Sequence, residues 1–462
     1  MCSWAFPANR SWISRCGCAA RSPAKRPFPS TRSTATAIIS PRRARSRSAD
    51  TLTGRASSRA ARSPNSSANS TRCCGRLWNK PYPKRGNHTE KRIFTVPDIY
   101  PEFVCKAENC TRNCCLGWHI TVSMRDYFKL VGMECTDGLR ERLDRSLHIL
   151  RDATPERYAE FSRTYTGDCP MLRPDGLCML QRECGEDALS AVCRYYPRSP
   201  RTLHADECAL SASCERVCEQ LFEKTDRMRF VDVPLEFADE LPKRSDDMIT
   251  RFYVPVRKLF VSALQNREYS LSERLAFCEK LAAVLRDGFA ARGISGIERA
   301  LEECSDLTPE RAANESVTRG FKTAAYMLSR LAERYPIERY AATCAESEYG
   351  ETEKEFLKRF PKWEIMCEQV LVNHVFYDGF PFYGDLRYDI YHAFAALAAL
   401  YAVWKVSSVC SLARKGDINA LVALTSELFR MAENSNFNIS AAALLANGGE
   451  IEKSVILPLC AL

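Results

Sequence analysis

The sequence predicts a mainly α fold in which a cysteine-rich domain precedes an α-helical domain, with a disordered N-terminal extension. Residues 1–90 are rich in Ser, Arg, Ala and Pro. The cysteines of the next segment gather in three blocks, and from about residue 226 apolar residues recur at three- and four-residue intervals. A chain of 462 residues exceeds one ordinary core. We therefore expect three parts, at residues 1–90, 91–225 and 226–462.

The N-terminal extension carries 18 Lys and Arg residues against two acidic residues, Asp50 and Glu90. It shows no apolar period, so its composition predicts disorder. A functionless tail or a start codon assigned too far upstream is the preferred explanation, while a basic arm and a transit peptide stay open. The rest of the chain carries 48 basic and 55 acidic residues, which gives no support for a nucleic-acid partner.

The 23 cysteines raise the question of compartment. The N-terminus lacks the continuous apolar segment of a secretory signal, and the adjacent Cys114 and Cys115 suit a ligand cluster better than a disulfide framework. We therefore expect a cytoplasmic protein. The most apolar run, Tyr391 to Trp404, is shorter than the roughly 20 residues of a membrane-spanning helix. It predicts a buried core helix and no membrane partner.

Order is expected to begin near Arg92, where apolar residues alternate. Leucines at helical spacing predict a helix over 137–150, with Asp137 as its N-cap, and 185–193 suggests a short helix that delivers Cys193. Between them, Pro-Asp-Gly at 174–176 predicts a turn that brings Cys178 back towards Cys169.

The C-terminal half is expected to be helical almost throughout, without a pair of alternating strands joined by a hairpin turn. Ser270 and Glu273 form a possible capping box, and Gly293 and Gly416 stand where helices are expected to end or connect.

The three cysteine blocks are the main chemical signal. The first has the spacing C-x4-C-x3-C-C, and the ten cysteines of the blocks are Cys105, Cys110, Cys114, Cys115, Cys169, Cys178, Cys193, Cys208, Cys214 and Cys218. Thiolates are soft ligands, and several that converge from a short span typically bind an iron–sulfur cluster or zinc. Paired C-x2-C knuckles are absent from the folded region, which favours iron–sulfur over zinc. His119 is an optional ligand, with a surface or packing role preferred.

The eight cysteines without a spacing partner are expected to be ordinary buried residues: Cys135, Cys184, Cys278, Cys304, Cys344, Cys367, Cys410 and Cys460. His374 lies on a predicted helix with Asn373, Tyr377 and Asp378, so these side chains either line a pocket or belong to the core. Arg194, Arg198 and Arg201 either draw an anion to the metal site or form a solvated face. A glycine-rich nucleotide loop and a Ser/His/Asp arrangement are absent, so Rossmann-type and hydrolase interpretations have no starting point.

Four segments resemble the flagellin lysine-N-methylase family, a cysteine-cluster group of zinc- or iron-chelating proteins. They read VPDIYPEFVCKAENCTRNCCLGWHITV, CPMLRPDGLCMLQRECGEDALSAVCRYYPR, ECALSASCE and VLVNHVFYDGFPF. The resemblance runs from about Ile93 to the C-terminus. It implies methyl transfer from S-adenosylmethionine to lysine ε-amines of flagellin, with an iron–sulfur (4Fe-4S) cluster and zinc as the alternative metal.

By position, the resemblance assigns the metal ligands as Cys105, Cys110, Cys114, Cys115, Cys169, Cys178, Cys193 and Cys214. Cys208 and Cys218 fall outside the family pattern. The family's Ser-Cys-Pro-Glu sequence lacks its Pro here, because Glu215 directly follows Cys214.

Two other functions remain open at this point. One is a non-catalytic zinc- or iron-binding module, such as a metal carrier or sensor. The other is an electron-transfer or radical protein, which ranks third because the C-x3-C-x2-C spacing of radical enzymes is absent.

Overall fold

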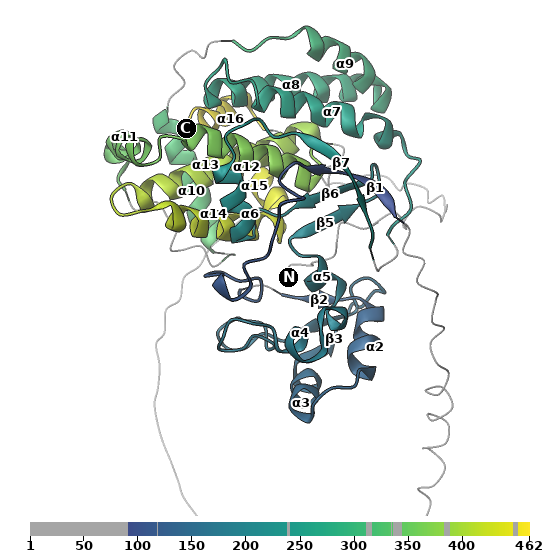
Figure 1. Ribbon diagram of the computed structural model, residues 1–462. Coiled ribbons are helices and arrows are strands. Elements are labelled where there is room, and N and C mark those ends of the chain that lie inside the picture. Colours follow the sequence, from purple (N-terminus) through teal and green to yellow (C-terminus); the bar gives the residue numbers. More distant parts are fainter. Residues whose placement is uncertain are drawn as a thin grey trace, which may run out of the picture. The chain divides into compact units, whose positions relative to one another are not determined.

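Helices predominate in the folded chain, as the sequence predicts. The computed structural model (Figure 1) describes residues 91–117, 119–237, 241–310, 317–333, 335, 344–382, 389–446 and 451–462. These residues lie in one compact unit that includes Thr89–Leu462. The predicted disorder of residues 1–90 falls outside the described residues.

Two small sheets accompany the helices. The strands are β1 (Arg92–Pro97), β2 (Thr121–Val122), β3 (Leu147–Ile149), β4 (Ala159–Phe161), β5 (Arg198–Arg201), β6 (Glu207–Leu210) and β7 (Phe230–Leu235). One sheet has the order β5-β6-β1-β7, and the other has the order β2-β4-β3. In the first sheet β1 is parallel to β6, with Thr95 opposite Glu207, and antiparallel to β7. This sheet places the segment before the first cysteine block beside the segment that leads to Cys214.

The helices fall in two groups along the chain. The cysteine-rich part contains η1 (Ala107–Asn109), α2 (Met124–Gly132), α3 (Asp137–Ser146), α4 (Met179–Cys184), η2 (Glu186–Ala188), α5 (Ala191–Tyr195) and α6 (Glu215–Glu223). The C-terminal part contains α7 (Met248–Leu264), α8 (Leu271–Arg292), α9 (Ile294–Asp306), α10 (Val317–Ala332), η4 (Glu346–Glu348), α11 (Tyr349–Arg359), α12 (Trp363–Asp378), α13 (Ile390–Leu412), α14 (Ile418–Glu433), α15 (Phe437–Leu445) and α16 (Lys453–Cys460). Figure 1 shows the second group packed as a helical array beside the larger sheet.

Two hydrophobic cores result from this arrangement. The smaller core lies among residues 120–189 and includes Leu130, Leu139 and Met171. The larger core joins Phe94 of β1 and Leu221 of α6 to the C-terminal helices. It therefore draws on residues on both sides of position 225, where the sequence places a domain boundary.

Helix α13 is the centre of the larger core. It spans Ile390–Leu412, 23 residues, and is therefore longer than the apolar run from which it was predicted. Among the described residues it is the one helix long and apolar enough to cross a membrane, and 94% of its most apolar window is buried inside the protein. Its burial matches the predicted core helix.

Several local predictions are confirmed. Ser270 and Glu273 form a complete capping box at the start of α8, and Gly293 ends that helix with φ +62°. The turn at 174–176 is also present: the Arg173 N–H donates to the Leu177 carbonyl (3.0 Å), and Leu172 forms an isolated bridge with Cys178.

Other local predictions are wrong. The helix expected over 137–150 has Thr136 as its N-cap and ends at Ser146, because residues 147–149 pair with β4 as strand β3. The helix expected over 185–193 is divided into η2 and α5 around Leu189, whose carbonyl accepts from the Lys129 ammonium group instead. In these segments tertiary hydrogen bonds override helical periodicity.

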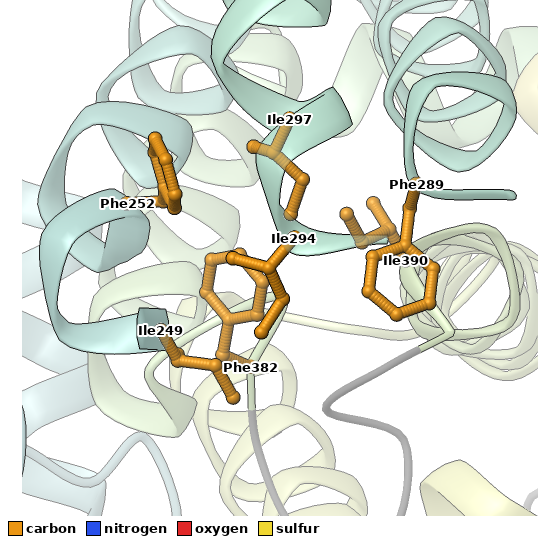
Figure 2. Close-up of a pocket in the computed structure, with 7 residues that line it drawn as sticks. All are labelled: Ile249, Phe252, Phe289, Ile294, Ile297, Phe382 and Ile390. Carbon is orange, nitrogen blue, oxygen red and sulfur yellow. The ribbon is translucent and has the colours of Figure 1, made fainter. Parts of the chain in front are cut away.

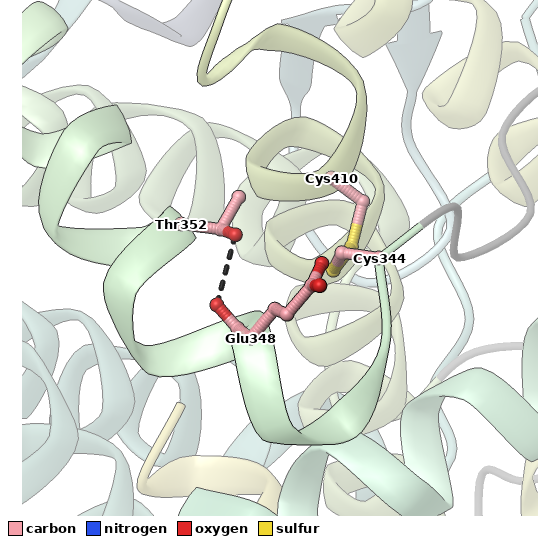
Figure 3. The surroundings of a disulfide bond; sticks show 4 residues. All are labelled: Cys344, Glu348, Thr352 and Cys410. Atoms are coloured by element: carbon pink, nitrogen blue, oxygen red, sulfur yellow. Dashed lines mark hydrogen bonds between the residues drawn. A yellow bond between two sulfur atoms is a disulfide. The ribbon is translucent and has the colours of Figure 1, made fainter.

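Two further corrections concern the C-terminal half. Residues 230–235 form strand β7 rather than a helix, because alternate apolar residues pair along the whole of β1. Cys344 and Cys410, expected to be unpaired, form a disulfide with Cα atoms 5.5 Å apart (Figure 3). Their separation of 66 residues leaves no spacing signal in the sequence.

A buried ion pair on α12 gives a test of this packing. The fully buried Glu368 carboxylate accepts from Nε and Nη2 of Arg267 (2.8 Å each) and from Nη1 of Arg274 (2.9 Å). Glu368→Gln leaves buried guanidinium charge without its counter-ion, and we expect a loss of about 3–5 kcal/mol in the free energy of unfolding, measured in urea.

The matched control is Glu364→Gln on the same helix. Glu364 also contacts Arg274 (3.5 Å), but its side chain is 56% exposed. This change should cost less than about 1 kcal/mol. Equal effects of the two substitutions would contradict the structural role given to Glu368.

Candidate functional site

The first cysteine block lies on an irregular loop rather than on a helix face. A turn around Asn113 shapes it: the Cys115 N–H donates to the Asn113 side-chain oxygen (3.0 Å), and the Leu116 N–H donates to the Asn113 carbonyl (3.3 Å). Gly117 follows with φ +78°, a conformation that favours glycine. This turn fixes the backbone that carries Cys114 and Cys115.

The second block is held directly against the first. The Cys169 N–H donates to the Cys115 carbonyl (2.8 Å). The turn at 173–177 then returns the chain, so that Cys178 opens helix α4 close to Cys169, with which its thiol interacts electrostatically. Backbone hydrogen bonds therefore bring two segments more than 50 residues apart into contact.

The thiols themselves meet around Cys115, which is hydrogen-bonded to both Cys114 and Cys169. The other predicted ligands interact electrostatically with members of this trio or with one another, and they are Cys105, Cys110, Cys178, Cys193 and Cys214. The structure thus brings all eight predicted ligands into one neighbourhood, called the thiol cluster below.

The thiol cluster is not a preformed coordination shell. Within the described ranges, no group of three or more His, Cys, Asp or Glu side chains is arranged to hold a metal ion. Its donor chemistry nevertheless fits a thiophilic metal, since the Cys115 thiol is hydrogen-bonded to two other thiols and further thiols interact with them electrostatically.

The thiols differ in acidity. The hydrogen bond from Cys115 lowers the pKa of Cys114 to about 7, against the effect of burial and with help from the charge of Arg430. The pKa of Cys115 is raised because its two thiol partners and burial both oppose its ionisation. Burial raises the pKa of Cys110 to about 11 and that of Cys214 to about 12. Cys114 is the thiol that ionises first among these four, which suits a metal ligand or nucleophile.

The remaining residues that the sequence singled out have other surroundings. His119 lies beside the Arg163 guanidinium and the Glu160 carboxylate (3.6 Å). Cys208 and Cys218 are completely buried in the larger core, where their thiols donate to the Tyr100 hydroxyl (3.4 Å) and the Ala212 carbonyl (2.9 Å). Their contacts agree with the family pattern, which omits both cysteines.

The arginines near Cys193 contact the protein and do not form a solvated face. Arg194 donates to the carbonyls of Asp187 and Leu189 (2.8 and 3.0 Å). Arg198 lies over the Phe103 ring at 4.9 Å. Arg201 donates to the last carbonyls of α12 and contacts Glu207 (3.4 Å). The anion-attracting role considered for this run gains no support from these contacts.

Arg430 of α14 joins the helical part to the thiol cluster. Its Nη1 donates to the carbonyls of Asn113 (3.3 Å) and Leu116 (3.0 Å). Its Nη2 donates to the carbonyls of Arg112 (3.0 Å) and Ser213 (3.2 Å). One guanidinium therefore positions the backbone on both sides of Cys114 and directly before Cys214.

A buried polar network continues from this point into the helical part. The Glu433 carboxylate is completely buried and accepts from the Ser211 hydroxyl and from the N–H groups of Ala212 (3.3 Å) and Ser213 (3.4 Å). On its other side it lies 3.5 Å from Nδ1 of His374. The His374 Nε2 in turn lies 3.4 Å from Asp378, which accepts from the Asn438 amide (3.0 Å).

The network is electrostatically coupled. Burial lowers the pKa of His374, but the charge of Asp378 and the hydrogen bond with Glu433 outweigh it, so the net pKa is raised. Burial raises the pKa of Glu433, and His374 opposes that change. The raised pKa values of His374 and Glu433 both favour the protonated forms, and a base that acts at neutral pH requires tuning of this kind.

The sequence identified only part of this network. His374, Tyr377 and Asp378 were singled out, whereas Arg430 and Glu433 were missed. A signal was available, since both charges interrupt the apolar pattern of INALVALTSELFRMAE on α14. Charged residues at apolar positions of a buried helix usually have specific partners.

Two hollows lie elsewhere. Figure 2 shows the first, lined by apolar side chains that include Phe252, Phe289 and Phe382, and its space of about 10 Å³ is roughly that of one water molecule. The second, about 450 Å³, lies between the ends of α2 and α4 and includes Cys135 and Cys184. Neither hollow includes a residue of the thiol cluster or of the buried network.

A known family model matches the part of the chain that contains α12 and α14. Residues 257–445 match the family model of the FliB lysine N-methylase C-terminal domain. Flagellar biosynthetic protein FliU of Salmonella muenchen is 28% identical over 136 residues, which cover 29% of this chain and 79% of that protein. No solved structure matches the chain.

Two relatives have names that state an activity. The lysine-N-methylases of Salmonella typhimurium (strain LT2) and Salmonella choleraesuis (strain SC-B67) are each 28% identical to this chain over 136 residues. The match covers a third, 33%, of the length of each. His374, Arg430 and Glu433 all lie inside the matched family domain. Residues 257–445 of this chain are therefore similar to the C-terminal domain of the FliB lysine N-methylases.

Proposed function

We propose that this protein is an S-adenosylmethionine-dependent N-methyltransferase that methylates lysine ε-amines of flagellin, with an iron–sulfur cluster held by the thiol cluster. The observation that carries the proposal is the match of residues 257–445 to the lysine N-methylase domain. The names of the flagellar relatives support flagellin as the substrate. The buried network holds a histidine and two carboxylates inside this domain, and Glu433 accepts from the segment directly before Cys214.

The reaction needs a neutral amine. A lysine ammonium, with an ordinary pKa near 10.4, must lose a proton before its nitrogen can attack. The nitrogen lone pair then forms a bond to the methyl carbon of the sulfonium donor. The carbon–sulfur bond breaks, and its electrons remain on sulfur as a neutral thioether. The protein must therefore orient the two substrates and accept one proton for each methyl group transferred.

The eight cysteines of the thiol cluster would hold the metal group, with zinc as the alternative to iron–sulfur. When bound, such a group supplies an electron-deficient metal that can anchor a carboxylate or amine ligand. Cys114 is the first candidate ligand because its pKa is about 7 and it lies at the centre of the electrostatic contacts.

The cytoplasm is the proposed compartment, and flagellin and S-adenosylmethionine are the proposed partners. Nucleic acids and membranes are not among the proposed partners. The excess of acidic residues after position 90 supports the omission of nucleic acid, and the burial of α13 supports the omission of a membrane.

The metal assignment is tested by Cys114→Ser. We expect the wild-type chain, purified without oxygen, to contain roughly four irons and four sulfides with a broad visible absorption band. Cys114→Ser should lose most of both, because a hydroxyl is a poor ligand for iron. Iron, sulfide and zinc analysis with a visible spectrum measures this.

Cys184→Ser is the matched control, since Cys184 is a partly buried cysteine of the same region outside the thiol cluster. It should keep the wild-type metal content. Equal metal content in Cys114→Ser and Cys184→Ser would contradict the assignment of the metal site to the thiol cluster. Stoichiometric zinc without visible absorption would indicate a zinc site in place of an iron–sulfur cluster.

Arg430→Met tests the dependence of the thiol cluster on α14. The change removes donors from four carbonyls, each of which costs about 1–3 kcal/mol when left buried without a partner. We expect reduced metal retention under dialysis against a chelator. Arg414→Met, on the exposed surface, should retain metal as the wild type does. Full retention by Arg430→Met would show that the loops hold their positions without it.

Methyl transfer is tested with flagellin and isotopically labelled S-adenosylmethionine, with mass spectrometry of lysine peptides. Label on flagellin lysines supports the proposal. A metal-loaded protein that neither binds the donor nor labels any protein lysine would instead support a non-catalytic metal-binding module.

A further inference from the structure

A continuous series of polar groups connects the thiol cluster to the surface. The stability of the fold does not explain why these groups are buried there. Elsewhere in the interior, the carboxylates of Glu207 and Glu368 pair with buried arginines. Here three ionisable side chains, Glu433, His374 and Asp378, lie together in the interior, and both carboxylates face the imidazole. Burying such groups carries a desolvation cost that apolar residues of similar size would avoid. Their arrangement therefore calls for a functional reason.

The series begins beside the thiol cluster. The Tyr196 phenol interacts electrostatically with Cys214 and Cys114. Its oxygen lies 3.1 Å from the Ser213 hydroxyl, and Ser213 directly precedes Cys214. The Ser213 hydroxyl contacts the Ser211 hydroxyl, which donates to Glu433.

The series ends near the surface. From Glu433 it continues to Nδ1 of His374 (3.5 Å) and from Nε2 to Asp378 (3.4 Å). The side chains of Glu433 and His374 are 0% and 4% exposed, whereas the Asp378 side chain is 13% exposed. The two nitrogens of one imidazole thus connect an enclosed carboxylate to one that reaches solvent.

The hydrogen atoms can all point one way. Because the Ser211 hydroxyl donates to Glu433, it can accept from Ser213, which can accept from Tyr196. In this orientation a proton that enters at Tyr196 displaces one proton at each step towards Glu433. An imidazole can take a proton at one nitrogen and release one from the other.

From this geometry we infer that a proton path connects the thiol cluster to the surface, through Tyr196, Ser213, Ser211, Glu433, His374 and Asp378. The inference rests on the proposed methyltransferase function and deepens it. The lysine N–H bond breaks at the cluster end, one proton is taken up by the Glu433–His374 pair, and one proton leaves from Asp378 to water. The lysine nitrogen keeps the electron pair with which it attacks the methyl group.

The path is distinct from the network's structural contacts. Tyr377 is buried on the same helix and hydrogen-bonds to Ser211, but it does not stand between two members of the path. Its backbone carbonyl is held by Arg201 independently of its side chain. The matched control is Tyr391→Phe on α13, which removes a buried hydroxyl that donates to Glu279 (2.8 Å) outside the path.

The test is His374→Ala in the full-length, metal-loaded protein, with and without added imidazole. We expect methyl transfer to flagellin to fall about 10²- to 10⁴-fold, the usual range for loss of an acid–base group. Imidazole, which can occupy the vacated space, should restore part of the rate. Metal content should equal that of the wild type, and Tyr391→Phe should lose less than about threefold in rate.

Each other outcome overturns the path. Undiminished activity of His374→Ala would show that protons leave by another route. Lost activity together with lost metal, and no rescue by imidazole, would assign His374 a purely structural role. If the wild-type protein methylates no lysine substrate, the proposed function is wrong and the path is wrong with it. Failure of the path alone is distinguishable, because the wild type is then active.

Discussion

The geometry of the thiol cluster depends on one buried guanidinium. Arg430 donates to four backbone carbonyls that belong to two distant segments, residues 112–116 and Ser213. An arginine can do this because it presents several N–H donors in a rigid planar fork and stays charged when buried. A lysine, with a compact ammonium group, lacks that geometry. The cysteine loop therefore takes its position from a helix that follows it by some 300 residues in sequence.

Helix α14 carries more than this one contact. Glu427, Arg430 and Glu433 recur at intervals of three residues, so they lie along one stripe of the helix. Glu427 pairs with Arg112 (2.8 Å), Arg430 holds the loop carbonyls, and Glu433 accepts from the segment before Cys214. Leu421 and Leu428 meanwhile lie in the larger core. One helix thereby joins the part of the chain that matches the family model to the cysteine segments that lie outside it.

Helix α12 is held by a complementary set of charges. Arg201 donates to the carbonyls of Phe376 and Tyr377 at its C-terminal end, where cations are favoured by the helix dipole. Arg201 is itself next to Glu207, which also binds Arg257 in the interior. Because β6 carries Glu207, the sheet and the end of α12 are fixed together. That anchoring sets where His374 and Asp378 stand relative to Glu433.

The sequence by itself determined the predominance of helices and several local turns and caps. Periodic apolar residues predicted the helical half, including the capping box at Ser270, because helix formation depends on local spacing and local hydrogen bonds. The Pro-Asp-Gly turn was equally local. Tertiary structure decided which residues meet: the end of α3 at Ser146, the strand β7, the disulfide of Cys344 with Cys410, and the contacts of Arg430 and Glu433. These depend on partners 10 to more than 300 residues away, and no local pattern specifies a contact whose partner is that distant.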